Sequence, residues 1–236
     1  MSHVAIIPAR GGSKRIPRKN VRLFHGKPMI VWSIEAAKQS HCFDRIVVST
    51  DDEEIAGIAL QAGAEVPFLR PSHLADDHSG TVPVVAHAMA ELGNLPTDAL
   101  ICCIYATAPF ILPEDLRQGC ALMLERQADY AFPVTTFPFP IQRALRLDPQ
   151  SGASMFWPEH AGTRSQDLPT AWHDAGQFYW GTQQAWTSGI HPFQANAVAV
   201  PIPRHRVQDI DVPEDWKRAE VLHRVLADMD TVGVPD

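Results

Sequence analysis

The sequence lacks the features that membrane, secreted and nucleic-acid-binding proteins need. No stretch approaches the ~18 continuous apolar residues that span a membrane, and the apolar run at residues 4–7 is too short for a signal peptide. The four cysteines, Cys42, Cys102, Cys103 and Cys120, have no metal-ligand spacing and indicate buried thiols in a reducing compartment. A net charge of −7 argues against a general nucleic-acid binder. We expect a soluble, cytoplasmic protein with neither a membrane nor a nucleic-acid partner.

Positive charge is concentrated in one segment near the N-terminus. Six of the twenty Lys and Arg residues lie from Arg10 to Arg22, directly after an apolar run that predicts a buried strand, and no acidic residue precedes Glu35. The adjacent Gly11 and Gly12 allow backbone N–H groups to approach an anion closely. Neither the Walker A nor the dinucleotide-binding glycine pattern is present. The residues alone favour a polyphosphate-binding loop, with a solvated basic loop or a nucleic-acid patch as the alternative.

The first 135 residues alternate between strand and helix patterns. Strands are expected at residues 3–7, 45–50, 99–104 and 130–135, and helices at 28–37, 51–62, 82–92 and 113–126. This alternation predicts a parallel sheet covered by helices on both faces. Residues 137–180, rich in proline and aromatic side chains, predict an inserted arm: an antiparallel excursion, a lid or a subunit contact. A strand at 195–202 and a helix at 213–229 complete one domain over residues 1–236.

Four motifs together resemble a known family. They are residues 7–20, Ser49-Thr50-Asp51, Arg70-Pro71 and Asp209-Ile210-Asp211, and they are similar to motifs of the cytidylyltransferases that activate acidic sugars. The resemblance implies a three-layer, Rossmann-like α/β nucleotidyltransferase fold with a mostly parallel central sheet and an inserted dimerisation arm. It also implies CTP and an acidic nine-carbon sugar as partners, Mg²⁺ as cofactor, and a homodimer. In such enzymes the anomeric hydroxyl attacks the α-phosphorus of CTP and pyrophosphate leaves.

The resemblance also implies roles for individual residues on the nucleotide side. The expected CTP-binding residues are Arg10, Gly11, Gly12, Ser13, Lys14, Lys19, Asn20, Arg70 and Thr81. Arg10, Lys19 and Asp211 are the expected catalytic residues, and Asp209 and Asp211 are the expected Mg²⁺ ligands. Spacing alone favours another role for Asp211, as part of a capping box for the last helix. Arg15, Arg18 and Arg22 are interpreted as surface cations that attract the substrate at long range.

The sugar site is expected in the arm. Its expected residues are Gln142, Arg143, Arg164, Gln166, His173, Asp174, Gln177 and Tyr179, with Arg143 or Arg164 holding the sugar carboxylate. For each residue the alternative is a subunit contact or a satisfied loop residue. Residues 102–109 and 173–179 most resemble the branch of the family that uses pseudaminic acid. Legionaminic, sialic and 3-deoxy-manno-octulosonic acids remain alternative substrates, and a non-catalytic nucleotide-binding module is a further alternative.

Overall fold

The central sheet contains seven strands, five of which run in the same direction. The computed structural model describes residues 2–76, 79–150 and 152–232. In spatial order the main strands are β11 (Ala197–Pro201), β6 (Tyr130–Thr136), β10 (Phe178–Thr182), β5 (Leu100–Ile104), β1 (Val4–Pro8) and β4 (Arg45–Ser49), and β9 (Trp172–Asp174) pairs with β6. Only β9 and β10 run antiparallel to their neighbours. The expected mostly parallel sheet is confirmed.

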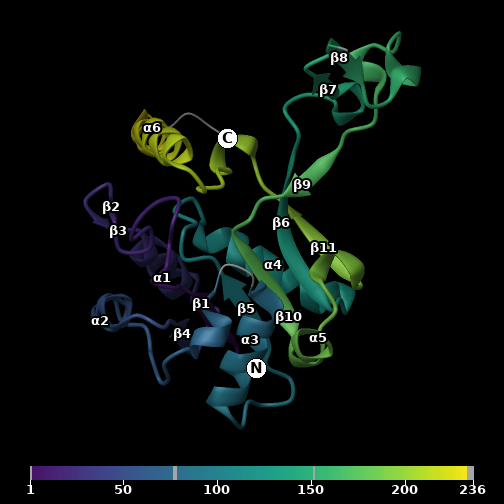
Figure 1. The fold of residues 1–236 in the computed structure, drawn as a ribbon. Helices are drawn as coiled ribbons and strands as arrows, with labels where there is room; N and C mark the ends of the chain where they lie inside the picture. The colour runs from purple at the N-terminus through teal and green to yellow at the C-terminus, as the bar shows by residue number, and fades with distance from the viewer. Residues whose placement is uncertain (1, 77–78, 151, 233–236) are drawn as a thin grey trace.

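Helices cover both faces of this sheet (Figure 1). One face carries α1 (Met29–Ser40), α2 (Glu53–Gln61) and α4 (Pro113–Arg126), and the other carries α3 (Thr81–Leu92) and α5 (Gln183–Ser188). Alternate residues of a strand point to opposite faces, so Ala5 and Ile7 enter the first core while Val4 and Ile6 enter the second. The three-layer α/β fold expected from the sequence is therefore present.

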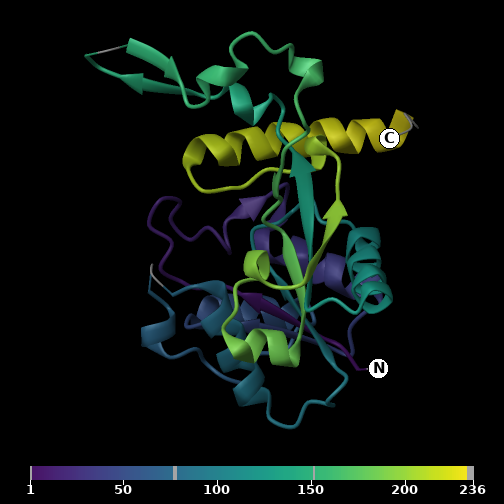
Figure 2. The same ribbon diagram turned by 90° about the vertical axis from the view of Figure 1, so that its right-hand side faces the viewer.

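The last helix closes one end of the sheet. Helix α6 (Pro213–Val232) lies across this end in Figure 2. Its Trp216 and Ala219 pack on Phe110 and on Phe24, which belongs to the short strand β2 (Leu23–Phe24) paired with β3 (Lys27–Pro28). This packing brings the chain just before α6, residues 203–212, next to the N-terminal loop.

The arm projects from the body of the molecule (Figure 1). It carries the hairpin of β7 (Leu145–Asp148) and β8 (Gly152–Met155), with helical turns at Ile141–Arg143, Pro158–His160 and Ser165–Asp167. The expected end of the arm at residue 180 is too late, because Phe178–Thr182 forms β10, a buried strand between β5 and β6. Pairing with two strands distant in sequence places β10 there, and local composition does not reveal it.

Two further expectations concern the cysteines and membrane spans. All four cysteines are free, and Cys102 and Cys103 face opposite cores, as strand geometry predicts. Burial raises the pKa of the Cys103 thiol and raises that of Cys120 to about 11, so both remain protonated at neutral pH. Among the described residues, no helix is both long enough and apolar enough to cross a bilayer.

Candidate active site

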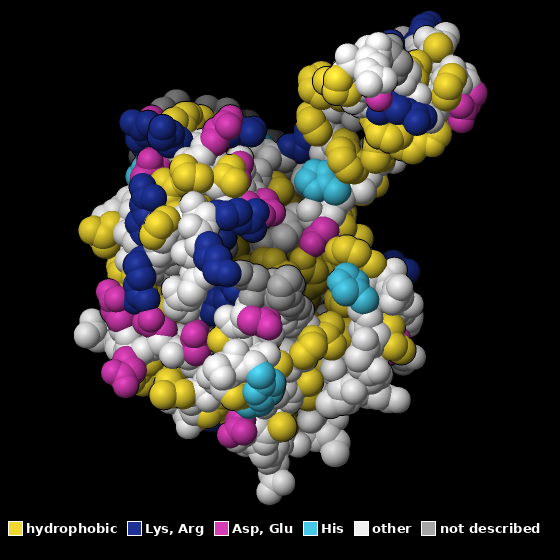
Figure 3. Space-filling model, viewed as in Figure 1, with side chains coloured by type: hydrophobic (Ala, Val, Ile, Leu, Met, Phe, Trp, Pro, Cys, Tyr) yellow, Lys and Arg dark blue, Asp and Glu magenta, His cyan; other side chains and the backbone are white. Residues whose placement is uncertain are grey.

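A cavity of about 260 Å³ opens at the carboxyl ends of β1 and β5. Three loops and the segment before α6 line it, with Pro8, Arg10, Ser13, Arg15, Lys19, Asn20, Arg70, Leu74, Asp76, Ser79, Gly80, Thr81, Val84, Tyr105, Ala106, Thr107 and Asp211. Figure 3 shows Lys and Arg side chains gathered in the middle of this face. Ligands of open α/β sheets bind at this edge, so the fold brings most of the expected nucleotide-binding residues together.

The basic loop packs against the beginning of α2. The Gly11 N–H donates to Asp51 Oδ1 at 2.9 Å, and Asn20 Nδ2 donates to the Arg10 carbonyl at 2.9 Å. A Cβ atom on Gly11 would lie 2.5 Å from Asp52 Oδ2, so only glycine fits. Asp51 thus accepts the Gly11 N–H in this structure, and a contact of Gly11 with the CTP phosphates stays a prediction. Gly12 and Lys14 lie in this loop next to the cavity-lining Ser13.

Lys19 connects the loop to the segment before α6. Its Nζ donates to the Ile210 carbonyl at 2.6 Å and lies 3.7 Å from Asp211 Oδ1. Burial lowers the pKa of Lys19, although the nearby Asp211 and Asp209 carboxylates favour its charged form. Arg15 also approaches Asp211, at 3.0 Å, and lines the cavity. Its side chain is 64% exposed, so Arg15 is a surface cation that also lines the cavity.

Asp211 does not cap α6. The Asp215 carboxylate, in the first turn of α6, accepts the N–H groups of Asp211 and Val212 at 3.0 and 2.9 Å and so fixes the chain that enters the helix. This leaves the Asp211 side chain directed toward Lys19 and Arg15. Asp209 lies two residues earlier, where loss of surrounding water and the charge of Asp211 raise the pKa of its carboxyl.

Asp209 and Asp211 suit a hard divalent cation. Such a cation takes one or two carboxylates and completes its shell with phosphate oxygens and water. Their mutual repulsion, which raises the pKa of Asp209, would be relieved by a cation between them. The described residues contain no group of three or more His, Cys, Asp or Glu arranged to hold a metal without a substrate. The donor set therefore fits a metal that arrives with a polyphosphate.

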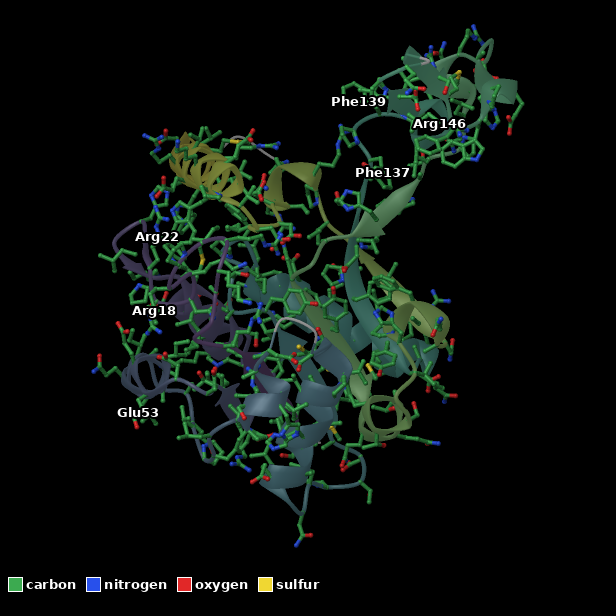
Figure 4. All side chains as sticks on the ribbon, in the orientation of Figure 1. Arg18, Arg22, Glu53, Phe137, Phe139 and Arg146 are labelled. Carbon is green, nitrogen blue, oxygen red and sulfur yellow. The ribbon has the colours of Figure 1, made fainter. Side chains whose placement is uncertain are left out.

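The other two loop cations point elsewhere. Arg18 pairs with Asp52 and Glu54 on α2, and the Arg22 guanidinium lies 4.5 Å from the centre of the Trp216 ring. Figure 4 places Arg18 and Arg22 on the outer edge of the molecule. Neither side chain lines the cavity, in agreement with their interpretation as cations outside the site.

The two residues expected at the cytosine base lie on one wall of the cavity. Arg70 is buried, and its guanidinium donates to the Ser49 carbonyl and hydroxyl and to the Leu74 carbonyl. Burial lowers the pKa of Arg70. Thr81 Oγ1 lies 3.2 Å from Tyr105 Oη, at the start of α3. Arg70 thus supports this wall by holding the backbone at Ser49 and Leu74, and Thr81 lines the cavity.

A second cavity of about 310 Å³ adjoins the first. The two share Gly80, Thr81 and Tyr105, and the second is also lined by Val82, Pro83, Asp174, Tyr179, Trp186, Gly189, His191, Pro192 and Phe193. The Tyr179 hydroxyl donates to the Asp174 carboxylate, and burial raises the pKa of Tyr179. Sequence reasoning missed Tyr105, Trp186 and Phe193 as wall residues. Only Tyr105 had a local signal, since it follows an apolar strand directly.

The remaining expected sugar-binding residues lie away from both cavities. Gln142, Arg143, Arg164, Gln166 and His173 belong to the arm and its base, and none of them lines either cavity. Within the arm, Arg143 donates to Ser165 Oγ at 3.1 Å and Arg164 pairs with Asp167 at 2.7 Å. Gln177 Nε2 instead donates to the Arg206 carbonyl at 2.7 Å. Of the eight residues, Asp174 and Tyr179 are the two that line either of these cavities in the described part of one chain.

The mostly parallel sheet has helices on both faces, and its basic loop faces the Asp209 and Asp211 carboxylates. This arrangement is that of a nucleotide-binding α/β protein of the nucleotidyltransferase class. The sequence model of the family described as Cytidylyltransferase matches residues 4–231, and the chain belongs to this family. The protein is therefore a nucleotidyltransferase. Enzymes of this family use CTP and generally need a divalent metal.

Named relatives agree with this assignment. A Campylobacter jejuni protein named pseudaminic acid cytidylyltransferase is 44% identical over 95% of this chain and 97% of its own length. A Legionella pneumophila protein named CMP-N,N'-diacetyllegionaminic acid synthase is 32% identical, over 94% of this chain and 96% of its own. A solved structure of CMP:2-keto-3-deoxy-manno-octonic acid synthetase complexed with CTP matches with a TM-score of 0.70 and 17% identity, over 95% and 99% of the two chains. At that identity the structural match shows a shared fold.

Proposed function

We propose that the protein transfers CMP from CTP to the anomeric hydroxyl of pseudaminic acid, with release of pyrophosphate. Family membership supports CMP transfer to an acidic ulosonate, and the relative with 44% identity supports pseudaminic acid as that sugar. One observation carries the proposal. The basic loop faces residues 209–211, here called the carboxylate segment, across one cavity, and Lys19 Nζ lies 3.7 Å from Asp211 Oδ1.

The nucleotide side of the reaction uses residues of the first cavity. The anomeric hydroxyl attacks the α-phosphorus in line, its proton passes to solvent, and the bond from the α-phosphorus to pyrophosphate breaks. Such a transfer depends on positioning and charge neutralisation. Arg10 and Lys19 neutralise the charge on the transferring and leaving phosphates, and Ser13 and Asn20 orient the nucleotide from the same loop. Gly12 and Lys14 complete the phosphate contacts, and Thr81 contacts the base.

Asp209 and Asp211 are the proposed ligands of Mg²⁺. When bound, this ion neutralises phosphate charge and lowers the pKa of the attacking hydroxyl. Lys19 holds the segment between the two carboxylates through its bond to the Ile210 carbonyl. Lys19 therefore has two roles in the proposal, because it both contacts phosphate and fixes the carboxylate segment.

The second cavity is the proposed position of the sugar. Asp174 and Tyr179 supply hydrogen bonds there, and Trp186 and Phe193 supply apolar contacts. The side chains that line this cavity include no Lys or Arg to hold the sugar carboxylate. We therefore assign that role to Arg143 or Arg164 from the arm of a second copy, assisted by Gln142, Gln166 and His173.

The arm has the surface that a homodimer needs. Phe139 is 79% exposed and Leu147 is 82% exposed. Phe137 and Phe139 lie at the base of the arm in Figure 4, and with Leu145 and Met155 they line one groove. Exposed apolar patches of this kind mark interaction sites, and a second copy of the chain is the occupant that would bring the arm arginines to a sugar cavity.

Pyrophosphate release from CTP tests the proposal. The assay contains CTP, Mg²⁺ and one of four sugars: pseudaminic, legionaminic, sialic or 3-deoxy-manno-octulosonic acid. We expect the highest kcat/KM with pseudaminic acid. Preference for another of these sugars would keep the chemistry and replace the substrate. No release with any of them would contradict CMP transfer itself.

A further inference from the structure

Two buried polar side chains, Asp115 and Gln177, contact the partly buried Arg206 beside the candidate active site. Asp115 on α4 is 4% exposed, and its carboxylate receives both Arg206 Nη1 at 2.6 Å and Arg206 Nη2 at 3.0 Å. Gln177, 3% exposed, donates from Nε2 to the Arg206 carbonyl at 2.7 Å. We call this set, Asp115, Gln177 and Arg206, the Arg206 bracket. It fixes both the side chain and the backbone of Arg206.

The bracket connects to the candidate active site on two sides. The Gln177 carbonyl accepts the N–H of Tyr105 at 2.8 Å, and Tyr105 lines both cavities. On the other side, Arg206 begins the segment that leads to Asp209 and Asp211. The end of this segment is also fixed, because Ile210 is fully buried and its carbonyl accepts Lys19 Nζ. The segment is thus held at both ends.

The composition of the bracket suits a geometric role. Desolvation of two charges offsets most of their attraction, so a buried ion pair contributes little net stability compared with an apolar pair of similar volume. Arg206 Nε and Gln177 Oε1 also have no hydrogen-bond partner within the described part of the chain. A two-pronged Arg–carboxylate contact does fix direction, which is what the segment carrying Asp209 and Asp211 requires.

We propose that Arg206 is a positioning residue, which holds residues 206–211 so that Asp209 and Asp211 are aimed at the divalent cation carried by CTP. This inference rests on the proposed CMP transfer. Arg206 lines neither cavity, so it acts through the backbone of its segment. Removal of the bracket leaves both carboxylates in the chain but allows them to move.

The test compares two double variants. Asp115→Leu/Arg206→Met removes the bracket pair without leaving an unpaired buried charge. Glu114→Gln/Arg117→Met removes an exposed ion pair from the same helix and is the matched control. Two quantities are measured: hydrogen exchange of the amides of residues 207–212, and Mn²⁺ binding in the presence of CTP by electron paramagnetic resonance.

The bracket variant is expected to exchange these amides at least about tenfold faster and to bind Mn²⁺ about tenfold more weakly. Its CTP binding without metal stays unchanged, and Arg206→Lys alone has a smaller effect. Wild-type exchange and Mn²⁺ affinity in the bracket variant, or equal losses in the control, would overturn the proposal.

Two additional measurements keep the test decisive. If the double variant does not fold, Gln177→Met removes only the bond to the Arg206 carbonyl and is expected to show the same faster exchange. Wild-type exchange in that variant would count against the proposal. Wild-type protein that binds Mn²⁺ with CTP but transfers CMP to no sugar would contradict the proposed function, and the exchange comparison would still decide the role of the bracket.

Discussion

The basic loop and the projecting arm both carry residues expected to bind substrate, but they differ in how completely one chain assembles them. In the loop, Arg10, Ser13, Lys19 and Asn20 line a single cavity together with Asp211, nearly 200 residues away in sequence. In the arm, the polar residues bind one another and large apolar side chains such as Phe139 face solvent.

We infer from this difference that the enzyme has two halves. In the proposed assignment one chain supplies the whole nucleotide half, because its loops line one cavity at the carboxyl edge of the sheet. The proposed sugar half has Asp174 and Tyr179 on its cavity wall, and the described side chains that line this cavity include no Lys or Arg. Variants of the nucleotide half should therefore act within one chain, and variants of the arm should act through a second copy.

Replacement of Asp211 should have the largest effect. We expect Asp211→Asn to lower kcat by about 10³-fold, because an amide is a poorer ligand for a hard cation and no longer balances Lys19. The fold should remain intact, since the Asp215 carboxylate and not that of Asp211 fixes the chain that enters α6. Pyrophosphate release and the thermal unfolding temperature check the two parts. Glu214→Gln, in the first turn of α6, is the control, and an equal loss in that variant would contradict a specific role for Asp211.

Lys19 should have the next largest effect. Lys19→Met is expected to lower kcat/KM for CTP by about 10²-fold, because a buried cation at the phosphates is lost. Burial lowers the pKa of Lys19, so activity should fall at alkaline pH earlier than an ordinary lysine would predict. Lys19→Arg stays protonated over this range, and its pH profile should lack that alkaline fall. A profile identical to that of the wild type would contradict the assignment.

The arm variants should have intermediate effects that depend on protein concentration. Phe139→Asp/Leu147→Asp places two charges on the exposed apolar surface of the arm. We expect the dimer dissociation constant to rise at least about tenfold, with a parallel loss of activity at low concentration. Sedimentation velocity and dilution of the assay measure both quantities. A wild-type protein that is monomeric at all concentrations would contradict the dimer.

Arg18 should have the smallest effect, although it is adjacent to Lys19. Its guanidinium pairs with Asp52 and Glu54 at the start of α2. Largely exposed pairs contribute little, so Arg18→Ala should lower the free energy of unfolding by about 0.5–1 kcal/mol and leave kcat nearly unchanged. Chemical denaturation and pyrophosphate release measure these quantities. A loss of kcat comparable to that of Lys19→Met would contradict the assignment of different roles to Arg18 and Lys19.

Local sequence signals predict the elements whose causes are local. Helix α4 spans residues 113–126 as expected, because Pro113 suits the first helical turn and the apolar residues recur at helical spacing. Strand β10 was hidden inside the expected arm. Its position depends on pairing with β5 and β6, and this pairing joins residues more than 40 positions apart.

The same distinction applies to the candidate site. The glycines and cations of the loop are visible as a cluster in the sequence, and the match to family motifs adds Asp209 and Asp211. Tyr105, Trp186 and Phe193 become neighbours only when α3, α5 and β10 pack together, so sequence spacing does not reveal them. The contact of Arg15 with Asp211 spans almost the whole chain, so local sequence does not reveal that this surface cation lines the cavity.

Mixing two inactive variants tests the division into halves most directly. One protein carries Asp211→Asn and the other carries Arg143→Ala/Arg164→Ala, each unable to complete one half of a site. If the arm of one copy serves the nucleotide half of its partner, mixed dimers contain one intact site. An equal mixture should then recover about one quarter of wild-type pyrophosphate release. No recovery, with mixed dimers shown to form, would contradict the account and assign both halves to the same chain.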